Sequence, residues 1–144
     1  MPIEVLVLTV GYKRPQYLYR SKGPFHHHLI AGGERQGDIE KILENIVYQQ
    51  LVRMGYAVSV GQLRAGEVDF VCTKSNERLY VQVAYLIASE ETEEREFGSL
   101  DNIKDNYPKY VISMTPLVRR SDRQGVVHLG LREFLKNGFE KKLP

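Results

Sequence analysis

The sequence predicts one α/β domain built on a mixed β-sheet. Two observations lead to this prediction: the chain has 144 residues, which is the length of one domain, and its apolar segments follow the order helix, three strands, helix, strand. An additional strand and helix follow at the C-terminal end. With 42% apolar and 26% charged residues, the chain has the composition of an ordinary globular protein. The predicted architecture is therefore a mixed sheet flanked by helices.

Charge and cysteine content limit the classes of function. The net charge is +2 and the sequence pI is about 8.6, which is too weakly basic to require a nucleic-acid partner. The single cysteine, Cys72, excludes an intramolecular disulfide and lies in an apolar strand segment, as an inert buried thiol would. The sequence contains neither an apolar stretch of membrane-spanning length nor a signal peptide. We therefore expect a cytoplasmic protein.

The N-terminal region is the least regular part of the sequence. Residues 3–10 predict a strand, whereas residues 11–37 are rich in Gly, Pro, Arg and Lys and show no clear period. We therefore treat residues 1–24 as an N-terminal strand and connector, and residues 25–144 as the domain. The run His26-His27-His28 is expected to be solvated or half-buried, because adjacent side chains diverge on any regular element and cannot all face one metal ion.

The middle of the chain predicts a helix and three strands. Asp38 is a candidate N-cap, and Gly55 is a candidate stop. Between them, apolar residues recur at helical spacing: Ile39, Ile42, Leu43, Ile46, Val47, Leu51 and Met54. Short turns then separate strand segments at 57–63, 67–73 and 79–87, which predicts an antiparallel meander.

The C-terminal third predicts a second helix and two more strands. Ser89 is a candidate N-cap, and Pro108 ends an apolar stripe made of Phe97, Leu100, Ile103 and Tyr107. The remaining segments are a strand at 109–114, a charged loop at 118–124, a strand at 126–129 and a short helix at 131–137.

Three polar residues stand out against apolar surroundings. Glu44 lies at the border of the first helix's apolar stripe, and Asp69 lies between Val68 and Phe70 in a strand. Because side chains alternate between the two faces of a strand, Asp69 is predicted to lie on the face opposite to Val68 and Phe70. Gln82 lies in the next predicted strand. An aspartate inside a central strand is costly to bury unless it is paired or binds a cation.

The order of these residues resembles the restriction-endonuclease-like fold of the PD-(D/E)XK nuclease superfamily. Residues 25–138 are more specifically similar to the uncharacterised C-terminal domain of prokaryotic AAA-type ATPases. The segments that carry the resemblance are Leu43–Tyr48, Arg53–Val58, Glu67–Val71, Tyr80–Tyr85, Thr92–Glu96 and Asp105–Ile112. The resemblance implies catalytic roles for Glu44, Asp69 and Gln82. Asp69 and Gln82 would hold Mg²⁺ or Mn²⁺, and Glu44 would be an outer ligand or hold a water.

The sequence departs from this pattern at the catalytic lysine. Ala84 occupies the position where such a site usually carries lysine. Lys74 and Lys104 are the candidates for a relocated lysine, whereas Arg95 cannot act as a base because its guanidinium stays protonated. The chain also lacks the G-x-x-x-x-G-K-[ST] phosphate loop, so it is not itself an ATPase of that type.

Three hypotheses about function follow. The first is a degenerate nuclease-like domain that binds nucleic acid or regulates a partner without cutting, with Arg119, Arg120 and Arg123 as candidate DNA contacts. The second is an active Mg²⁺-dependent DNA endonuclease that uses a relocated lysine. The third is a protein-interaction module for an AAA-type ATPase, in which Asp69 pairs with Arg95 or Lys104.

Overall fold

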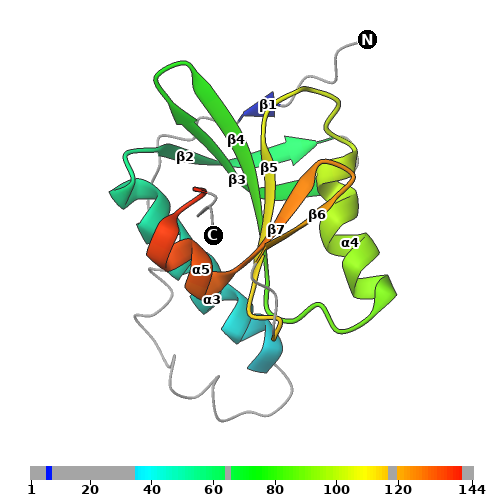
Figure 1. Cartoon of the computed structure of the whole chain (residues 1–144). Helices are drawn as coiled ribbons and strands as arrows, with labels where there is room; N and C mark the ends of the chain where they lie inside the picture. The colour runs from blue at the N-terminus through cyan, green and yellow to red at the C-terminus, as the bar shows by residue number, and fades with distance from the viewer. Residues whose placement is uncertain (1–5, 8–34, 64–65, 117–119, 141–144) are drawn as a thin grey trace.

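The computed structural model describes residues 6–7, 35–63, 66–116 and 120–140. In these residues a seven-stranded sheet has helices on both faces (Figure 1). The strands are β1 (Leu6–Val7), β2 (Ala57–Leu63), β3 (Gly66–Lys74), β4 (Glu77–Ala84), β5 (Lys109–Ser113), β6 (Arg120–Arg123) and β7 (Val126–Gly130). The helices are α3 (Arg35–Arg53), α4 (Glu90–Asp101) and α5 (Leu131–Asn137). The predicted α/β class is confirmed.

The sheet is mixed, as the sequence predicts. Its strand order is β1-β2-β3-β4-β5-β7-β6. Strands β1 to β4 pair antiparallel in sequence order, so the predicted meander is confirmed. Strands β4, β5 and β7 are parallel neighbours, and β6 pairs antiparallel with β7. The carboxyl ends of three parallel strands therefore lie along one edge of the sheet.

Two cores cover the two faces of the sheet. Helices α3 and α5 lie on one face and α4 lies on the other (Figure 1). Leu43, Val47 and Leu51 of α3 are buried in the first core, together with Phe134 of α5 and the fully buried thiol of Cys72. The second core is built on α4 and contains Phe97, Leu100, Ile103, Val68, Val71, Tyr80, Val111 and Val126.

Helix α4 begins where the sequence predicts and ends earlier. The Ser89 hydroxyl accepts a hydrogen bond from Thr92 N at 3.2 Å, which confirms the N-cap. The helix stops at Asp101, so the prediction that it continues to Pro108 is wrong, and Tyr107 is exposed. The Asp105 carboxylate organises this segment instead, because it accepts bonds from the Tyr80 hydroxyl and from Tyr107 N.

The predicted charged loop at 118–124 contains a strand. Arg120–Arg123 forms β6, which pairs with β7 as a hairpin. Gln124 (φ 51°) and Gly125 (φ 83°) connect the two strands, and two positive φ values are typical of a tight hairpin turn. Strand β6 ends the strand order, so in the described part of the chain it pairs with one strand only.

The N-terminal predictions are tested only in part. Leu6–Val7 is a strand, inside the segment predicted at residues 3–10, whereas the other residues of 1–24 and the histidine run lie outside the described part of the chain. Helix α3 begins at Arg35, so Asp38 lies in the first helical turn and is not the N-cap. Among the described residues, no helix combines the length and the apolar character needed to cross a membrane.

Candidate functional site

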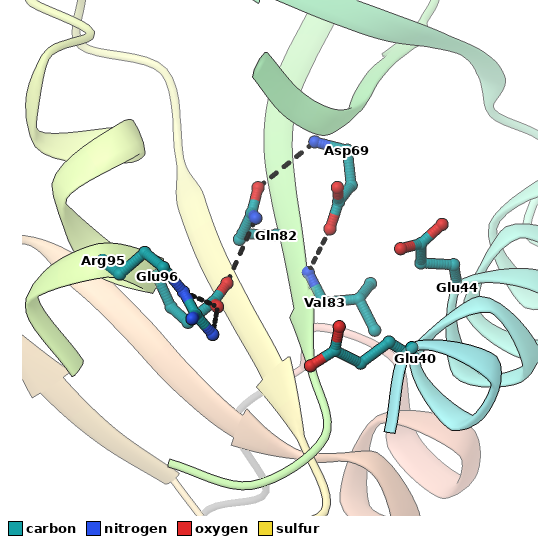
Figure 2. A pocket seen from close by; sticks show the side chains of 8 residues that line it. Glu40, Glu44, Asp69, Gln82, Val83, Arg95 and Glu96 are labelled. Atoms are coloured by element: carbon teal, nitrogen blue, oxygen red, sulfur yellow. Dashed lines mark hydrogen bonds and ion pairs between the residues drawn. The ribbon is translucent and has the colours of Figure 1, made fainter. Parts of the chain in front are cut away.

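Glu44, Asp69 and Gln82 lie around one pocket of about 380 Å³ (Figure 2). Glu40 and Glu44 come from α3, Asp69 from β3, Gln82 and Val83 from β4, and Arg95 and Glu96 from α4. With Gly37, these residues complete the lining. We call this the acidic pocket, because it gathers four carboxyl groups and one guanidinium.

A β-bulge in β3 directs Asp69 toward this pocket. Ser59 of β2 pairs with Val71, and Gly61 pairs with Val68. Asp69 and Phe70 therefore together face the single residue between Ser59 and Gly61. The predicted alternation fails here: Val68 packs in the α4 core and Phe70 in the α3 core, so the two do not share a face. The extra residue frees Asp69 from the regular pattern of the strand.

Side chains replace ladder hydrogen bonds where β3 and β4 separate. Registered pairing between the two strands reaches only to Phe70 and Val81. Beyond that pair, Asp69 N donates to Gln82 Oε1 at 3.2 Å, and Val83 N donates to Asp69 Oδ2 at 2.8 Å. Asp69 and Gln82 thus hold the diverging strands together, and each satisfies a backbone N–H that the ladder leaves unpaired.

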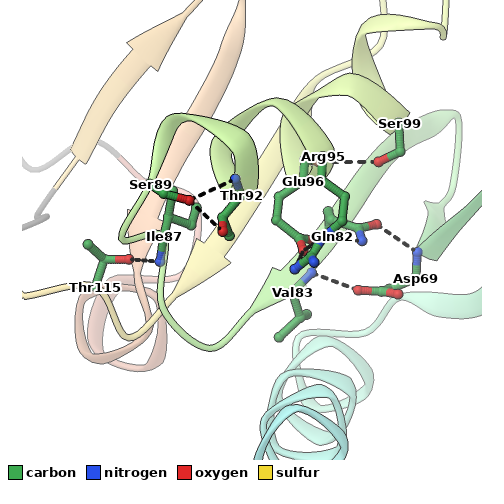
Figure 3. Close-up of polar contacts among 10 residues, drawn as sticks. All are labelled: Asp69, Gln82, Val83, Ile87, Ser89, Thr92, Arg95, Glu96, Ser99 and Thr115. Atoms are coloured by element: carbon green, nitrogen blue, oxygen red, sulfur yellow. Dashed lines mark hydrogen bonds and ion pairs between the residues drawn. The ribbon is translucent and has the colours of Figure 1, made fainter. Parts of the chain in front are cut away.

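The network continues from Gln82 into helix α4 (Figure 3). Gln82 Nε2 donates to Glu96 Oε2 at 3.2 Å, while Arg95 Nε and Nη2 both donate to Glu96 Oε1, at 3.0 Å and 2.8 Å. The Glu96 side chain is 10% exposed and that of Arg95 is 65% exposed. The predicted direct pairing of Asp69 with Arg95 or Lys104 is therefore wrong: the Arg95 guanidinium pairs with Glu96, and Gln82 lies between that pair and Asp69.

Burial and neighbouring acids raise the pKa of Asp69 to about 8. Burial is the largest cause, and the negative charge of Glu44 is the second. The bond from Val83 N lowers the pKa, while Glu96 and Glu40 raise it further. The Asp69 carboxyl is therefore largely protonated at neutral pH, and the pocket holds one negative charge fewer than its four acids suggest.

The lysines proposed as substitutes for the missing catalytic group lie elsewhere. Lys74 Nζ donates to the carbonyl of Met54 at 2.9 Å, and Lys104 Nζ donates to the carbonyl of Asp101 at 2.7 Å. Neither lines the acidic pocket, and Ala84 is buried at the usual lysine position. Arg95 is the sole cation among the described lining residues, and it cannot accept a proton.

The residues as arranged do not fit the Mg²⁺ or Mn²⁺ site that the resemblance implies. The donor chemistry is suitable, because carboxylate and amide oxygens are the ligands of hard cations. However, the Gln82 amide oxygen already accepts a hydrogen bond from the Asp69 N–H. Among the described residues, no three His, Cys, Asp or Glu side chains are grouped so as to hold a metal ion. We therefore derive no reaction step through a metal.

Of the three arginines predicted to contact DNA, the structure describes the side chain of Arg123 alone. Arg123 Nη1 pairs with Glu93 Oε1 at 2.9 Å, and its guanidinium lies over the Phe97 ring at 5.4 Å. Arg123 thus ties the β6–β7 hairpin to α4, which leaves it less available to a phosphate. Arg119 lies outside the described residues, and only the backbone of Arg120 is described.

Two lining acids were missed by sequence reasoning. Glu40 precedes Glu44 by one helical turn, and that spacing was the available signal. Glu96 is buried although it is charged. It lies four residues before Leu100 and seven before Ile103, so its place on the apolar stripe could have identified it as a paired buried acid.

The chain is similar to an uncharacterized protein of Haemophilus influenzae, with 42% identity over 113 residues. The match covers 71% of this chain and 28% of the Haemophilus protein, so this chain spans less than a third of that relative's length. No family model and no solved structure matches the chain.

Proposed function

We propose that this chain is a restriction-endonuclease-like domain that does not cleave phosphodiester bonds and acts as a nucleic-acid-binding or regulatory module. The observation that carries the proposal is the use of Asp69 and Gln82 as strand connectors. Gln82 Oε1 accepts a hydrogen bond from Asp69 N of β3, and Asp69 Oδ2 accepts one from Val83 N of β4. A metal ion bound to these two oxygens would compete with the backbone for them, and a bond lost to the ion would leave a poorly solvated N–H group.

The charges of the acidic pocket favour a regulatory module over a nucleic-acid-binding module. Glu40, Glu44 and Glu96 surround Asp69, and Arg95 is already paired with Glu96. A phosphate backbone would be repelled from such a pocket. In the Haemophilus relative the matched region is 28% of the protein, as expected for a module attached to a larger one. An AAA-type ATPase module is the partner that the sequence resemblance suggests.

A second candidate function is an active Mg²⁺-dependent DNA endonuclease. The observation that favours it is the concentration of carboxyl groups around Asp69, whose pKa is raised to about 8. Acids that repel one another are stabilised when a cation enters. This candidate requires Gln82 to release the Asp69 N–H and a base to come from outside the described lining.

Cleavage assays test the proposal directly. Plasmid and single-stranded DNA are incubated with the protein and with Asp69→Asn, in Mg²⁺ and separately in Mn²⁺. The asparagine can still accept the bond from Val83 N, so the variant keeps the fold while losing the acid. We expect no cleavage by either protein. Metal-dependent nicking that disappears in Asp69→Asn would overturn the proposal and establish the endonuclease.

Duplex-DNA binding separates the two non-cleaving roles. The affinity is measured between about 50 and 200 mM salt, because phosphate contacts give a steep salt dependence. An absence of binding at low salt identifies a regulatory module. Salt-sensitive binding identifies a nucleic-acid-binding module. If the protein binds DNA, the affinity of Arg123→Gln for duplex DNA then shows whether the β6–β7 hairpin contacts the DNA.

A further inference from the structure

A second cavity, of about 1010 Å³, lies at the carboxyl ends of β5 and β7. It is lined by Ser113, Met114, Thr115, Pro116, Gly130, Leu131, Arg132, Glu133, Leu135 and Lys136. We call it the strand-end groove. Ser113 and Gly130 are paired neighbours on parallel strands, and the chain turns into α5 directly after Gly130. In open α/β sheets, the crevice outside the carboxyl ends of the strands is where ligands bind.

The groove offers an apolar wall to a ligand. Met114 is 48% exposed and Leu135 is 40% exposed, and they are among the most exposed large apolar residues in the described chain. Pro116 and Leu131 extend the lining. A wall of this kind, next to a few polar groups, is typical of a small-molecule site, and the volume is at the upper limit of the usual range for one.

Two cations stand beside this wall. Arg132 and Lys136 lie one turn apart on α5, so their side chains can approach the same group. No described residue forms a hydrogen bond or an ion pair with either of them. The one acid in the lining, Glu133, accepts a bond from Asn137 Nδ2 at 2.6 Å. The groove therefore has an excess of positive charge, in contrast to the acidic pocket.

The floor of the groove contains a hydrogen-bonded cluster made by Ser113, Thr115 and His128. Ser113 Oγ lies 2.7 Å from His128 Nε2, a distance that could suggest a nucleophile and its base. However, Ser113 Oγ donates to Thr115 Oγ1 at 2.9 Å and accepts from Thr115 N at 3.2 Å. Ser113 Oγ is thus hydrogen-bonded both to His128 and to Thr115. The contact between Ser113 and His128 joins the carboxyl end of β5 to β7.

We propose that the strand-end groove binds a small phosphorylated molecule with an apolar or aromatic body. A phosphate monoester carries close to two negative charges, which match Arg132 and Lys136. Arginine can bind phosphate oxygens in a bidentate manner, and lysine adds a point charge. The apolar body would lie against Met114 and Leu135. This site is separate from the acidic pocket and does not depend on the proposed function.

Phenyl phosphate is a suitable probe, because it joins a phosphate to an aromatic ring. Backbone amide shifts of the ¹⁵N-labelled protein are followed while phenyl phosphate is added at constant ionic strength. Inorganic phosphate and phenol are titrated in parallel. We expect saturable shifts around Met114, Thr115 and Leu135 with a dissociation constant on the order of 1 mM, a range typical of such small ligands. Inorganic phosphate and phenol should each bind at least about tenfold more weakly than phenyl phosphate, because the first lacks the apolar contacts and the second lacks the phosphate contacts.

The double variant Arg132→Gln/Lys136→Gln is the decisive comparison. Both side chains are exposed, so the variant should fold, and amides distant from α5 report whether it does. Its affinity for phenyl phosphate should fall at least about tenfold. Lys104→Gln, which neutralises a lysine outside the groove, is the matched control and should bind as the original protein does. Unsaturable shifts, equal binding of inorganic phosphate, or unchanged binding by the double variant would overturn the proposal.

Discussion

The acidic pocket and the strand-end groove lie on the same sheet and use their polar groups differently. In the acidic pocket, Asp69 and Gln82 are committed to backbone N–H groups, and the Arg95 guanidinium is committed to Glu96. In the strand-end groove, Ser113, Thr115 and His128 form hydrogen bonds with one another. Arg132 and Lys136, by contrast, have no partner among the described residues. The acidic pocket contains the residue types of a catalytic site, but Asp69, Gln82, Arg95 and Glu96 are already hydrogen-bonded to one another and to the backbone. The availability of polar atoms therefore separates a structural network from a binding site.

The largest expected effect comes from removing the connector of the acidic pocket. Gln82→Leu leaves the Asp69 N–H without its partner and removes one hydrogen bond to the Glu96 carboxylate, which keeps its pairing with Arg95. We expect a loss of about 3 kcal/mol in the free energy of unfolding, because one poorly solvated N–H becomes unsatisfied and one hydrogen bond to a charged group is lost. Urea denaturation measures the loss, and Gln49→Leu on the exposed side of α3 is the control. A loss no larger than that of the control would contradict the structural role of Gln82.

The next effect is a pH dependence that arises from Asp69. Its pKa is about 8 in the folded protein and near 3.8 in the unfolded chain, so between these values the folded state binds one proton more. Stability contributed by Asp69 is therefore present at low pH and is lost as the pH rises from about 4 to about 8. Asp69→Asn removes this dependence. We expect the variant to exceed the original protein in unfolding free energy by at least about 2 kcal/mol at pH 8 and to lose that advantage near pH 4.

Thermal and urea unfolding of both proteins across this range measures the difference. Asp101→Asn changes a carboxyl outside the acidic pocket and should show no comparable trend. Adding Mg²⁺ in large excess over the protein should leave the difference in unfolding free energy unchanged. A cation that bound Asp69 would stabilise the ionised form and abolish the pH dependence, which would favour the endonuclease instead.

Sequence patterns predicted the secondary structure well where an element is determined by its own residues and the adjoining turns. The period of α3 and the short turns between β2, β3 and β4 gave the helix and the meander, and Ser89 gave the start of α4. The short strand β6 was not predicted, because its sequence is charged and polar and the strand forms by backbone pairing with β7. Strand propensity cannot report such a pairing, since it is decided by the hairpin turn.

The sequence predicted which residues form the candidate site, but it could not predict the hydrogen bonds that those residues make. The positions of Glu44, Asp69 and Gln82 suggested one cluster, and the structure places all three around the acidic pocket. Strict alternation along β3 could not reveal the inserted residue at the bulge, which gives Asp69 its direction. Nor could it reveal that Gln82 bonds to Glu96, because that contact joins residues from a strand and a later helix. These long-range bonds determine whether the residues are free to act.

The smallest expected effect compares one cation from each region. Arg95→Gln leaves the buried Glu96 carboxylate without its charged partner, so we expect a loss of about 1 kcal/mol in unfolding free energy. Lys136→Gln removes a cation that has no described partner, and we expect a change of no more than about 0.5 kcal/mol. Urea denaturation of the two variants side by side measures the contrast. Equal losses would mean that Lys136 is also committed to the fold, and the strand-end groove would then lack the free charge that distinguishes it from the acidic pocket.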